Sequence, residues 1–296
     1  MQGYLAAERP RVDAALDRAL GRFADRIHHD LAPAVRHGVR SGGKRLRPVL
    51  CVAAYCAVRG GEAPEAAYDL ATSLEFIHAY SLMHDDLPCM DDADLRRGAP
   101  TTHREHGVAA TARGGLVLIP LASLVAWEAS ERLACTEAVR REMVRALNGA
   151  AGAAGMVGGQ LLDLDGEGRA LDAGALDDLH RRKTGALLTA ALTLGALAGG
   201  AADDTRAALE AYGRAVGLAF QVADDILDAT ATAGELGKNP SDEALDKSTY
   251  VSLHGLNEAR ARARSLVDEA LTALAGARLE APPLEALARY VVDRRH

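Results

Sequence analysis

The chain contains 296 residues, of which 49% are hydrophobic and 25% are charged, and its formal net charge is −7 at pH 7. This length is ample for a large buried core. The acidic balance, the 4% aromatic content and the lack of a sustained basic stripe argue against nucleic acid as a partner. The four cysteines, Cys51, Cys56, Cys89 and Cys135, form no C-x-x-C pair. We therefore predict neither a zinc site nor disulfide bonds, and the cysteine usage favours a reducing cytoplasm.

Two stretches of the sequence bear on location. The N-terminus contains Glu8, Arg9 and Arg11 but no apolar segment of the signal-peptide type, so we expect no signal peptide. Residues 184–202 carry no charge, a pattern produced both by a membrane span and by a fully buried helix of a large bundle. Because this run is rich in Ala, Gly and Thr and the mean hydropathy of the chain is −0.05, we expect a core helix in a cytoplasmic protein, without stable membrane insertion.

In chain order, the predicted elements are all helices. Apolar residues at helical spacing, punctuated by Gly and Pro, predict helices over 10–29, 31–40, 44–59, 64–87, 115–134, 136–165, 172–198, 203–231, 256–276 and 282–294. Pro120 is expected to kink the helix that contains it. The sequence shows no convincing β-alternation and no repeat. It therefore predicts an all-α, single-domain helix bundle over residues 1–296.

The first acidic cluster follows the long helix predicted over 64–87. Five carboxylates occur within ten positions, namely Asp85, Asp86, Asp91, Asp92 and Asp94. Two unit charges about 4 Å apart repel by roughly 4 kcal/mol at an effective dielectric constant of 20. A hard divalent cation reverses that sign, and Mg²⁺ usually takes one or two carboxylates together with waters and substrate phosphates. On its own, this cluster is better explained as a solvated acidic loop.

A second acidic cluster favours the metal interpretation. Asp224 and Asp228 are four residues apart and share one face of a predicted helix, with Asp225 beside them. Like charges at that spacing destabilise an isolated helix. Since the flanking residues are apolar, this is not an ordinary polar surface. Two such clusters on apolar helices together predict a metal site.

Basic residues supply the complementary charge. In residues 41–47, a glycine break precedes Lys44, Arg45 and Arg47 at a predicted helix start, where backbone N–H groups and the helix dipole favour an anion. The spacing is not that of a Walker A loop, and alone it fits a basic surface turn equally well. Further cations adjoin polar breaks at Arg96, Arg97, Lys183, Lys238 and Lys247. Together with the acidic clusters they predict a polyphosphate held between metal ions and Lys or Arg side chains.

The order of these motifs resembles the trans-isoprenyl (polyprenyl) diphosphate synthases, most closely the bacterial farnesyl diphosphate synthases. The matching segments are residues 42–48, 77–92, 95–98, 158–164, 183–186, 221–228 and 247–250. The resemblance implies an all-α isoprenoid-synthase fold, in which the helix bundle surrounds a central cavity. A homodimer and three Mg²⁺ ions, for which Mn²⁺ could substitute, are implied as well. It also implies condensation of isopentenyl diphosphate with dimethylallyl or geranyl diphosphate to farnesyl diphosphate (C15), by ionisation, condensation and proton elimination. Geranyl or geranylgeranyl diphosphate synthesis is the alternative, and a class I terpene cyclase or a non-catalytic synthase subunit is a more distant one.

The resemblance also implies roles for individual residues. Direct metal ligation falls to Asp85, Asp91 and Asp224, and ligation mainly through metal-bound water to Asp86, Asp225 and Asp228. The implied catalytic residues are Asp85, Asp86, Asp91, Lys183, Asp224 and Asp225. The implied ligands of the allylic diphosphate are Arg96, Lys183, Lys238 and Lys247, with Thr184 and Gln221 nearby, and those of isopentenyl diphosphate are Lys44, Arg47, His78 and Arg97.

Product length is expected to depend on the helix that enters the first acidic cluster. Tyr80 and Ser81 precede Asp85, and Tyr80 lies about 7.5 Å from it along the helix at a rise of 1.5 Å per residue. A tyrosine at that depth would form the floor of the pocket and stop chain growth. Residues 234–246 are the candidate lid. Arg113, Leu116 and a shortened loop at 238–242 depart from the family pattern.

Overall fold

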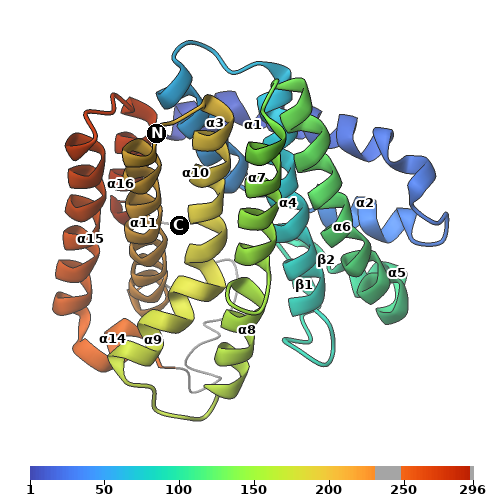
Figure 1. Cartoon of the computed structure of the whole chain (residues 1–296). Helices are drawn as coiled ribbons and strands as arrows, with labels where there is room; N and C mark the ends of the chain where they lie inside the picture. Colours follow the sequence, from blue (N-terminus) through green and yellow to red (C-terminus); the bar gives the residue numbers. More distant parts are fainter. Residues whose placement is uncertain (231–247, 294–296) are drawn as a thin grey trace. The chain divides into compact units, whose positions relative to one another are not determined.

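The computed structural model describes residues 1–230 and 248–293, and most of these residues are helical (Figure 1). The helices are α1 (Gln2–Arg22), the 3-10 turn η1 (Ala24–Arg26), α2 (Ala32–Arg40), α3 (Leu46–Arg59), α4 (Glu65–Asp85), α5 (Thr102–His106), α6 (Val108–Arg132), α7 (Glu137–Ala151), α8 (Met156–Asp165), α9 (Ala173–His180), the π-helical segment η2 (Arg181–Gly185), α10 (Ala186–Gly199), α11 (Asp203–Thr230), α14 (Tyr250–His254), α15 (Leu256–Gly276) and α16 (Pro282–Asp293). Two short strands, β1 (Leu95–Arg96) and β2 (Ala99–Pro100), form an antiparallel hairpin. The predicted all-α class is confirmed.

Some predicted boundaries differ from the structure. The helix expected over 136–165 is divided, since α7 ends at Ala151 and α8 begins at Met156. Glycines 152 and 155 occupy the break, and glycine is a poor residue for a helix interior. The helix expected over 115–134 starts earlier, at Val108. Each strand of the hairpin has two residues, too few for alternation to reveal it in the sequence.

The backbone contacts divide the described chain into two compact units. The N-terminal unit comprises residues 2–52 and 61–145, and the C-terminal unit comprises Met1, residues 53–60 and the described residues from 146 onward. The single domain over residues 1–296 stays a prediction.

In the N-terminal unit, α4 packs against α1, α2 and α6, and α4 and α6 run side by side (Figure 1). Pro64 is the N-cap residue of α4 and has an extended conformation. The negative charge of Glu65, in the first turn, interacts favourably with the positive end of the helix dipole. From Ala67 to Ile77 every residue of α4 is buried, so this helix forms the centre of the unit. The first acidic cluster begins at the C-terminal end of α4, where most of its aspartates are no longer buried.

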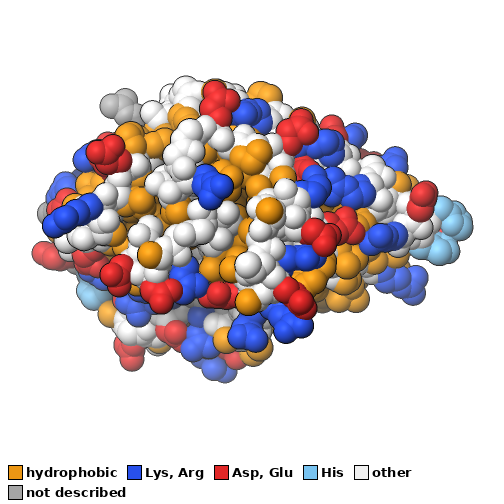
Figure 2. Space-filling view, turned by 45° about the horizontal axis from the view of Figure 1, so that its top comes forward, with side chains coloured by type: hydrophobic (Ala, Val, Ile, Leu, Met, Phe, Trp, Pro, Cys, Tyr) orange, Lys and Arg blue, Asp and Glu red, His pale blue; other side chains and the backbone are white. Residues whose placement is uncertain are grey.

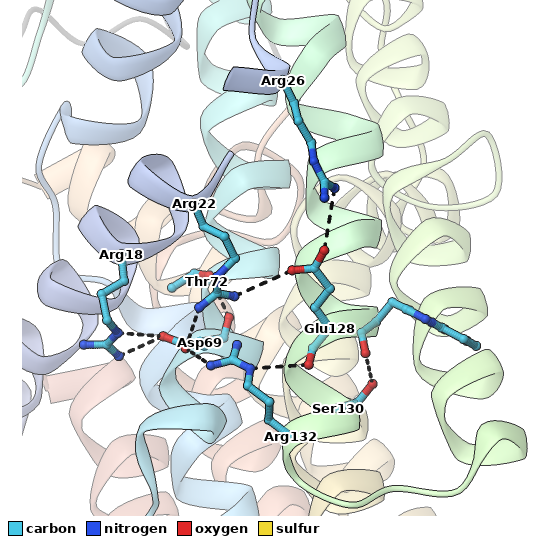
Figure 3. A network of polar contacts seen from close by, with 9 residues as sticks. Arg18, Arg22, Arg26, Asp69, Thr72, Glu128, Ser130 and Arg132 are labelled. Atoms are coloured by element: carbon cyan, nitrogen blue, oxygen red, sulfur yellow. Dashed lines mark hydrogen bonds and ion pairs between the residues drawn. The ribbon is translucent and has the colours of Figure 1, made fainter. Parts of the chain in front are cut away.

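A buried ion network joins α1, α4 and α6 (Figure 3). The Asp69 side chain is 3% exposed and accepts hydrogen bonds from Arg18 Nη2 at 2.8 Å and Arg132 Nη1 at 2.6 Å. Arg22 lies between Asp69, at 3.4 Å, and Glu128, at 3.8 Å. A buried carboxylate is tolerated only when it is paired and hydrogen-bonded. The network therefore fixes the N-terminal half of α4 against both neighbouring helices.

In the C-terminal unit, α11 contacts α10, α14, α15, α16 and η2. Tyr212 is fully buried, and its hydroxyl donates to the carbonyl of Leu284 on α16 at 2.7 Å. Gly217 allows α11 to touch the backbone of η2, because a Cβ there would lie 2.8 Å from the Cα of Gly185. The uncharged helix α10 is buried over most of its length, as predicted for residues 184–202.

Helix α6 is the one described helix that is long and apolar enough, by length and composition alone, to cross a membrane. It buries Leu118, Leu121 and Val125 and contacts α4, as a core helix does. Its outer face keeps apolar residues exposed, with Leu116 at 58% and Leu124 at 38%. On the face drawn in Figure 2, apolar side chains appear among charged ones.

Candidate active site

The first acidic cluster folds back on the end of α4. The N–H of Asp91 donates to the carbonyl of Asp85 at 2.9 Å, and the N–H of Ala93 donates to the carbonyl of Asp86 at 3.2 Å. Asp92 has a positive φ of 45°, which lets the chain reverse. The turn thus brings the backbone of Asp91 beside that of Asp85, although six positions separate them in the sequence.

The five carboxylates of this cluster differ in their partners. Arg96 binds Asp86, whereas Arg104 on α5 pairs with Asp94 at 2.6 Å and with Asp92 at 3.4 Å. Asp91 is exposed and forms no ion pair with any residue that the structure describes. Sequence reasoning missed Arg104, because nothing in the local pattern links a helix residue to a preceding turn.

Cations gather near His78 on α4. Burial, followed by the charges of Arg47 and Arg97, holds the pKa of His78 well below its usual value of 6.5. Burial also lowers the pKa of Arg47, with Glu75 opposing that shift and Arg97 adding to it. The Nε of Arg47 is buried and has no hydrogen-bond partner among the described residues. A buried donor of this kind fits an anion that completes it.

Arg45 lies in the same group but has its own partners. It donates to Asp13 at 2.9 Å, to Glu75 at 2.7 Å and to the carbonyl of Val39 at 3.2 Å. Those bonds tie the start of α3 to α1 and α4. The ligand set expected from the sequence includes Lys44 and Arg47 and does not include Arg45.

The glycine pair of residues 42–43 makes room for Arg97. Gly42 and Gly43 have φ values of 78° and 118°, which a residue with a side chain rarely adopts. A Cβ at Gly43 would lie 2.7 Å from Cζ of Arg97, and Arg97 Nη1 donates to the carbonyl of Gly42. The glycine motif and the Arg96-Arg97 motif therefore meet, and Lys44 extends from the same turn.

Tyr80 packs against its neighbour one turn along α4. Its ring makes an edge contact with His84, with centroids 4.7 Å apart, and His84 Nε2 lies 3.0 Å from the carbonyl of Ala112 on α6. Gly115 permits this packing, since a Cβ there would lie 2.6 Å from His84 Cδ2. Burial and then the charge of Asp85 raise the pKa of Tyr80. Ser81 donates to the carbonyl of His78 at 2.9 Å, within its own helix.

In the C-terminal unit, Lys183 and Thr184 lie on the π-helical segment η2. Such segments are rare and often occur at functional sites. Lys183 Nζ donates to Asp163 Oδ2 on α8 at 2.6 Å, and a Cβ at Gly159 would lie 2.6 Å from the Cα of Lys183. Asp163 falls within the matching segment 158–164, and the sequence assigns it no role. The four-residue spacing of Gly159 and Asp163, which puts both on one face of α8, was the available signal.

The second acidic cluster lies near the end of α11. Gln221, Asp224 and Asp228 are partly exposed, whereas Asp225 is buried with 6% exposure. Asp225 Oδ2 accepts from the N–H of Tyr250 at 2.7 Å and lies 3.8 Å from His180 Nε2. Burial raises the pKa of Asp225, and His180 opposes that shift.

Some predicted residues lie outside the described part of the chain. These are Lys238, Lys247 and the candidate lid over 234–246. The segment that follows Lys247 is described. Ser248 Oγ accepts from the N–H of Leu171 at 3.0 Å, and Thr249 forms a capping box with Ser252 at the start of α14.

The donor set of both clusters fits Mg²⁺, because it consists of carboxylate oxygens. Among the described residues, three ligand atoms come within 4.8 Å of one another only at His28, His29 and Asp30, which are exposed. The aspartate clusters thus offer fewer ligands at a time.

The chain is similar to known proteins both in sequence and in structure. The family model described as Polyprenyl synthetase matches residues 28–280. The chain is 44% identical over 288 residues to farnesyl diphosphate synthase of Escherichia coli, covering 94% of this chain and 95% of that one. It is 41% identical over 296 residues to a dimethylallyltranstransferase of Fischerella ambigua, covering 99% and 83%. The crystal structure of an FPP/GFPP synthase from Zymomonas mobilis superposes with a TM-score of 0.81 at 37% identity, covering 97% of this chain and 99% of that one.

Proposed function

We propose, because the chain belongs to the polyprenyl synthetase family, that it is a prenyltransferase that condenses isopentenyl diphosphate with an allylic diphosphate into a short-chain prenyl diphosphate. The observation that carries the proposal furthest is the turn that places Asp91 beside Asp85. Two carboxylates on one turn, followed by a pair of arginines, offer the oxygen ligands and the cations that a metal-bound diphosphate requires.

Mg²⁺ is the metal that we assign to this site. Asp85 and Asp91 of the first cluster and Asp224 and Asp228 of the second would hold it, with three ions in all and Mn²⁺ as a substitute. When bound, Mg²⁺ supplies Lewis-acid stabilisation of the charge that develops on the leaving diphosphate.

The cations of the chain bind the two diphosphates. Arg96 and Lys183 hold the allylic diphosphate, with Thr184 and Gln221 nearby and with Lys238 and Lys247 from outside the described residues. The orphan Nε of Arg47 supports a second anion at the cationic group near His78. We assign isopentenyl diphosphate to that group, which comprises Lys44, Arg47, His78 and Arg97.

The reaction follows from these charges. Cleavage of the allylic C–O bond leaves negative charge on the diphosphate and positive charge on carbon. Fixed cations stabilise the first without reorganisation during the reaction. The alkene of isopentenyl diphosphate then attacks the allylic carbon, and a proton is lost to the departing diphosphate. Water must be excluded, since it would quench the cation.

We assign a C15 product, farnesyl diphosphate, on the basis of Tyr80. Its ring is braced by His84, which in turn contacts the Ala112 carbonyl, so the floor that it would form is fixed. Ser81 is the second residue assigned to chain length. Geranyl and geranylgeranyl diphosphate are the alternative products.

We also propose a cytoplasmic homodimer. The exposed apolar residues of α6, Leu116 and Leu124, support burial of that helix face against a second copy. Sedimentation of the purified protein tests the dimer, since a monomer at micromolar concentration would contradict it.

The activity is tested by mixing the purified protein with Mg²⁺, isopentenyl diphosphate and either dimethylallyl or geranyl diphosphate. A longer linear diphosphate supports the proposal. A cyclic hydrocarbon would identify a terpene cyclase. The absence of any product from a folded protein would indicate a non-catalytic subunit.

A further inference from the structure

The second aspartate of the first pair is turned into the protein. Asp86 is 3% exposed and caps the C-terminus of α4. Arg96 Nε lies 2.8 Å from its Oδ1 and 2.9 Å from its Oδ2, and Arg96 Nη2 lies 2.5 Å from Oδ1. An arginine that contacts both oxygens of a carboxylate is fixed in position and orientation. Asp86 therefore determines where the guanidinium of Arg96 lies.

The second aspartate of the other pair is buried as well. Asp225 accepts the N–H of Tyr250, the first residue of α14, at 2.7 Å. His180, the residue directly before η2, lies 3.8 Å away and stacks on the ring of Tyr250. Asp225 thus connects α11 both to the start of α14 and to the end of α9.

In both motifs the other carboxylates are more exposed. Asp85 and Asp91 lie at the turn after α4, and Asp224 and Asp228 lie on the partly exposed face of α11. We propose that Asp86 and Asp225 are positioning residues, which hold protein donors in place, and that metal ligation falls to the other aspartates of the two motifs. The inference rests on the proposed function and refines it.

The physical reason is the cost of releasing these partners. A carboxylate of Asp86 that turned towards a metal would leave Arg96 as a partly buried cation without its pair. A carboxylate of Asp225 that did so would leave the Tyr250 N–H without an acceptor in a buried position. The other carboxylates of the two motifs are more exposed, so a metal can approach them from the solvent.

Asparagine distinguishes the two roles at position 225. Asp225→Asn keeps an oxygen that accepts the Tyr250 N–H but loses the charge that Mg²⁺ needs. Asp224→Asn is the matched control on the neighbouring residue. The measurement is calorimetric binding of inorganic pyrophosphate at a series of Mg²⁺ concentrations. We expect less than about fivefold weakening for Asp225→Asn and about tenfold or more for Asp224→Asn.

The hydrogen bond itself is tested by two substitutions at Tyr250. Proline is well tolerated at the first position of a helix, and the extended conformation of Thr249 suits a following proline. Tyr250→Pro therefore removes the N–H and the ring, whereas Tyr250→Ala removes the ring alone. Weaker pyrophosphate binding by the proline variant than by the alanine variant is the expected result. Equal binding by the two would contradict a role for the N–H.

For Asp86 the test is a double-mutant cycle with Arg96. If Asp86 acts through Arg96, Asp86→Asn weakens pyrophosphate binding in the native background but adds little to Arg96→Gln. The Mg²⁺ concentration at half-saturation should then stay within about threefold of the native value in all three variants. If Asp86 ligates the metal, the two losses multiply and that concentration rises.

The outcomes separate this inference from the proposed function. A native chain that binds no pyrophosphate with Mg²⁺ and makes no prenyl diphosphate would refute the function, and the inference with it. The positioning roles alone would be refuted if the native chain does both and one of two further results is found. Either Asp225→Asn loses as much pyrophosphate affinity as Asp224→Asn, or the losses of affinity caused by Asp86→Asn and Arg96→Gln multiply in the double variant. Circular dichroism of each variant confirms that binding is compared between folded proteins.

Discussion

Lys183 on the π-helical segment η2 donates a 2.6 Å hydrogen bond to Asp163 on α8. The bond fixes a long, flexible cation before any substrate is present, and the backbone contact of Gly159 with η2 fixes the segment itself. A preoriented cation costs less to order when the allylic diphosphate binds. Asp163 is therefore expected to influence turnover through Lys183.

The first prediction concerns that pair. Asp163→Asn should lower kcat/KM for the allylic diphosphate by about 10- to 100-fold, which corresponds to the loss of a hydrogen bond to a charged group. Steady-state kinetics with geranyl diphosphate provide the measurement. Asp178→Asn is the control, because it breaks a half-exposed ion pair with Arg182, which lies one helical turn later and 2.9 Å away. Equal kcat/KM values for the two variants would contradict a role of Asp163 in turnover.

The second prediction concerns product length. Tyr80→Ala removes the ring that His84 braces, so the growing chain should pass it and the main product should lengthen from C15 to C20 or beyond. Liquid chromatography of the dephosphorylated products gives the distribution. Tyr290→Ala, on α16, is the control for loss of a tyrosine and should leave the distribution unchanged. If Tyr80→Ala still makes only the C15 product, Tyr80 does not form the floor that stops chain growth.

The third prediction concerns the pH dependence of stability. Burial and the neighbouring arginines hold the pKa of His78 in the folded chain well below 6.5. Between those two values the unfolded chain binds a proton that the folded chain does not, so stability falls as pH drops below about 6.5. His78→Gln should lose that part of the pH dependence in urea unfolding. His254→Gln, at an exposed position, should keep it. Parallel curves for native chain and His78→Gln would contradict the prediction.

The fourth prediction concerns the contact of α11 with η2. Gly217→Ala introduces a Cβ 2.8 Å from the Cα of Gly185, so α11 and η2 must separate. We expect a loss of about 1–3 kcal/mol of stability, as for other overpacked sites. Gly21→Ala on α1 is the control, because nothing lies within 4 Å of its added Cβ. Thermal unfolding compares the two variants. Equal melting temperatures would contradict the prediction that the close contact between α11 and η2 contributes to stability.

Much of the fold could be predicted because it depends on local pattern. The apolar periodicity of α4, α10 and α11 and the Gly and Pro breaks located most helices to within a few residues. The π-helical turn over Arg181–Gly185 escaped prediction, because one extra residue in a turn leaves the helical pattern almost unaltered. The hairpin around Gly98 escaped because its strands are too short to alternate.

The site was predictable in its residue types but not in their pairing. The motifs located both acidic clusters and most of the cations. They did not reveal that Arg96 and Arg104 form ion pairs with carboxylates of the first cluster, or that Asp163 forms an ion pair with Lys183. Such pairs join different helices, so they depend on tertiary packing and leave no trace in local spacing.

The central claim is that both aspartate motifs act on the allylic diphosphate during chain elongation. The most direct measurement is mass spectrometry of the product formed from geranyl diphosphate, isotopically labelled isopentenyl diphosphate and Mg²⁺, with the native chain, Asp85→Asn and Asp224→Asn. We predict one labelled five-carbon unit in a C15 diphosphate from the native chain, and rates at least about 100-fold lower for each variant, since each loses transition-state stabilisation of roughly 3 kcal/mol. A folded native chain that makes no prenyl diphosphate, or a variant that makes it at the native rate, would contradict the account.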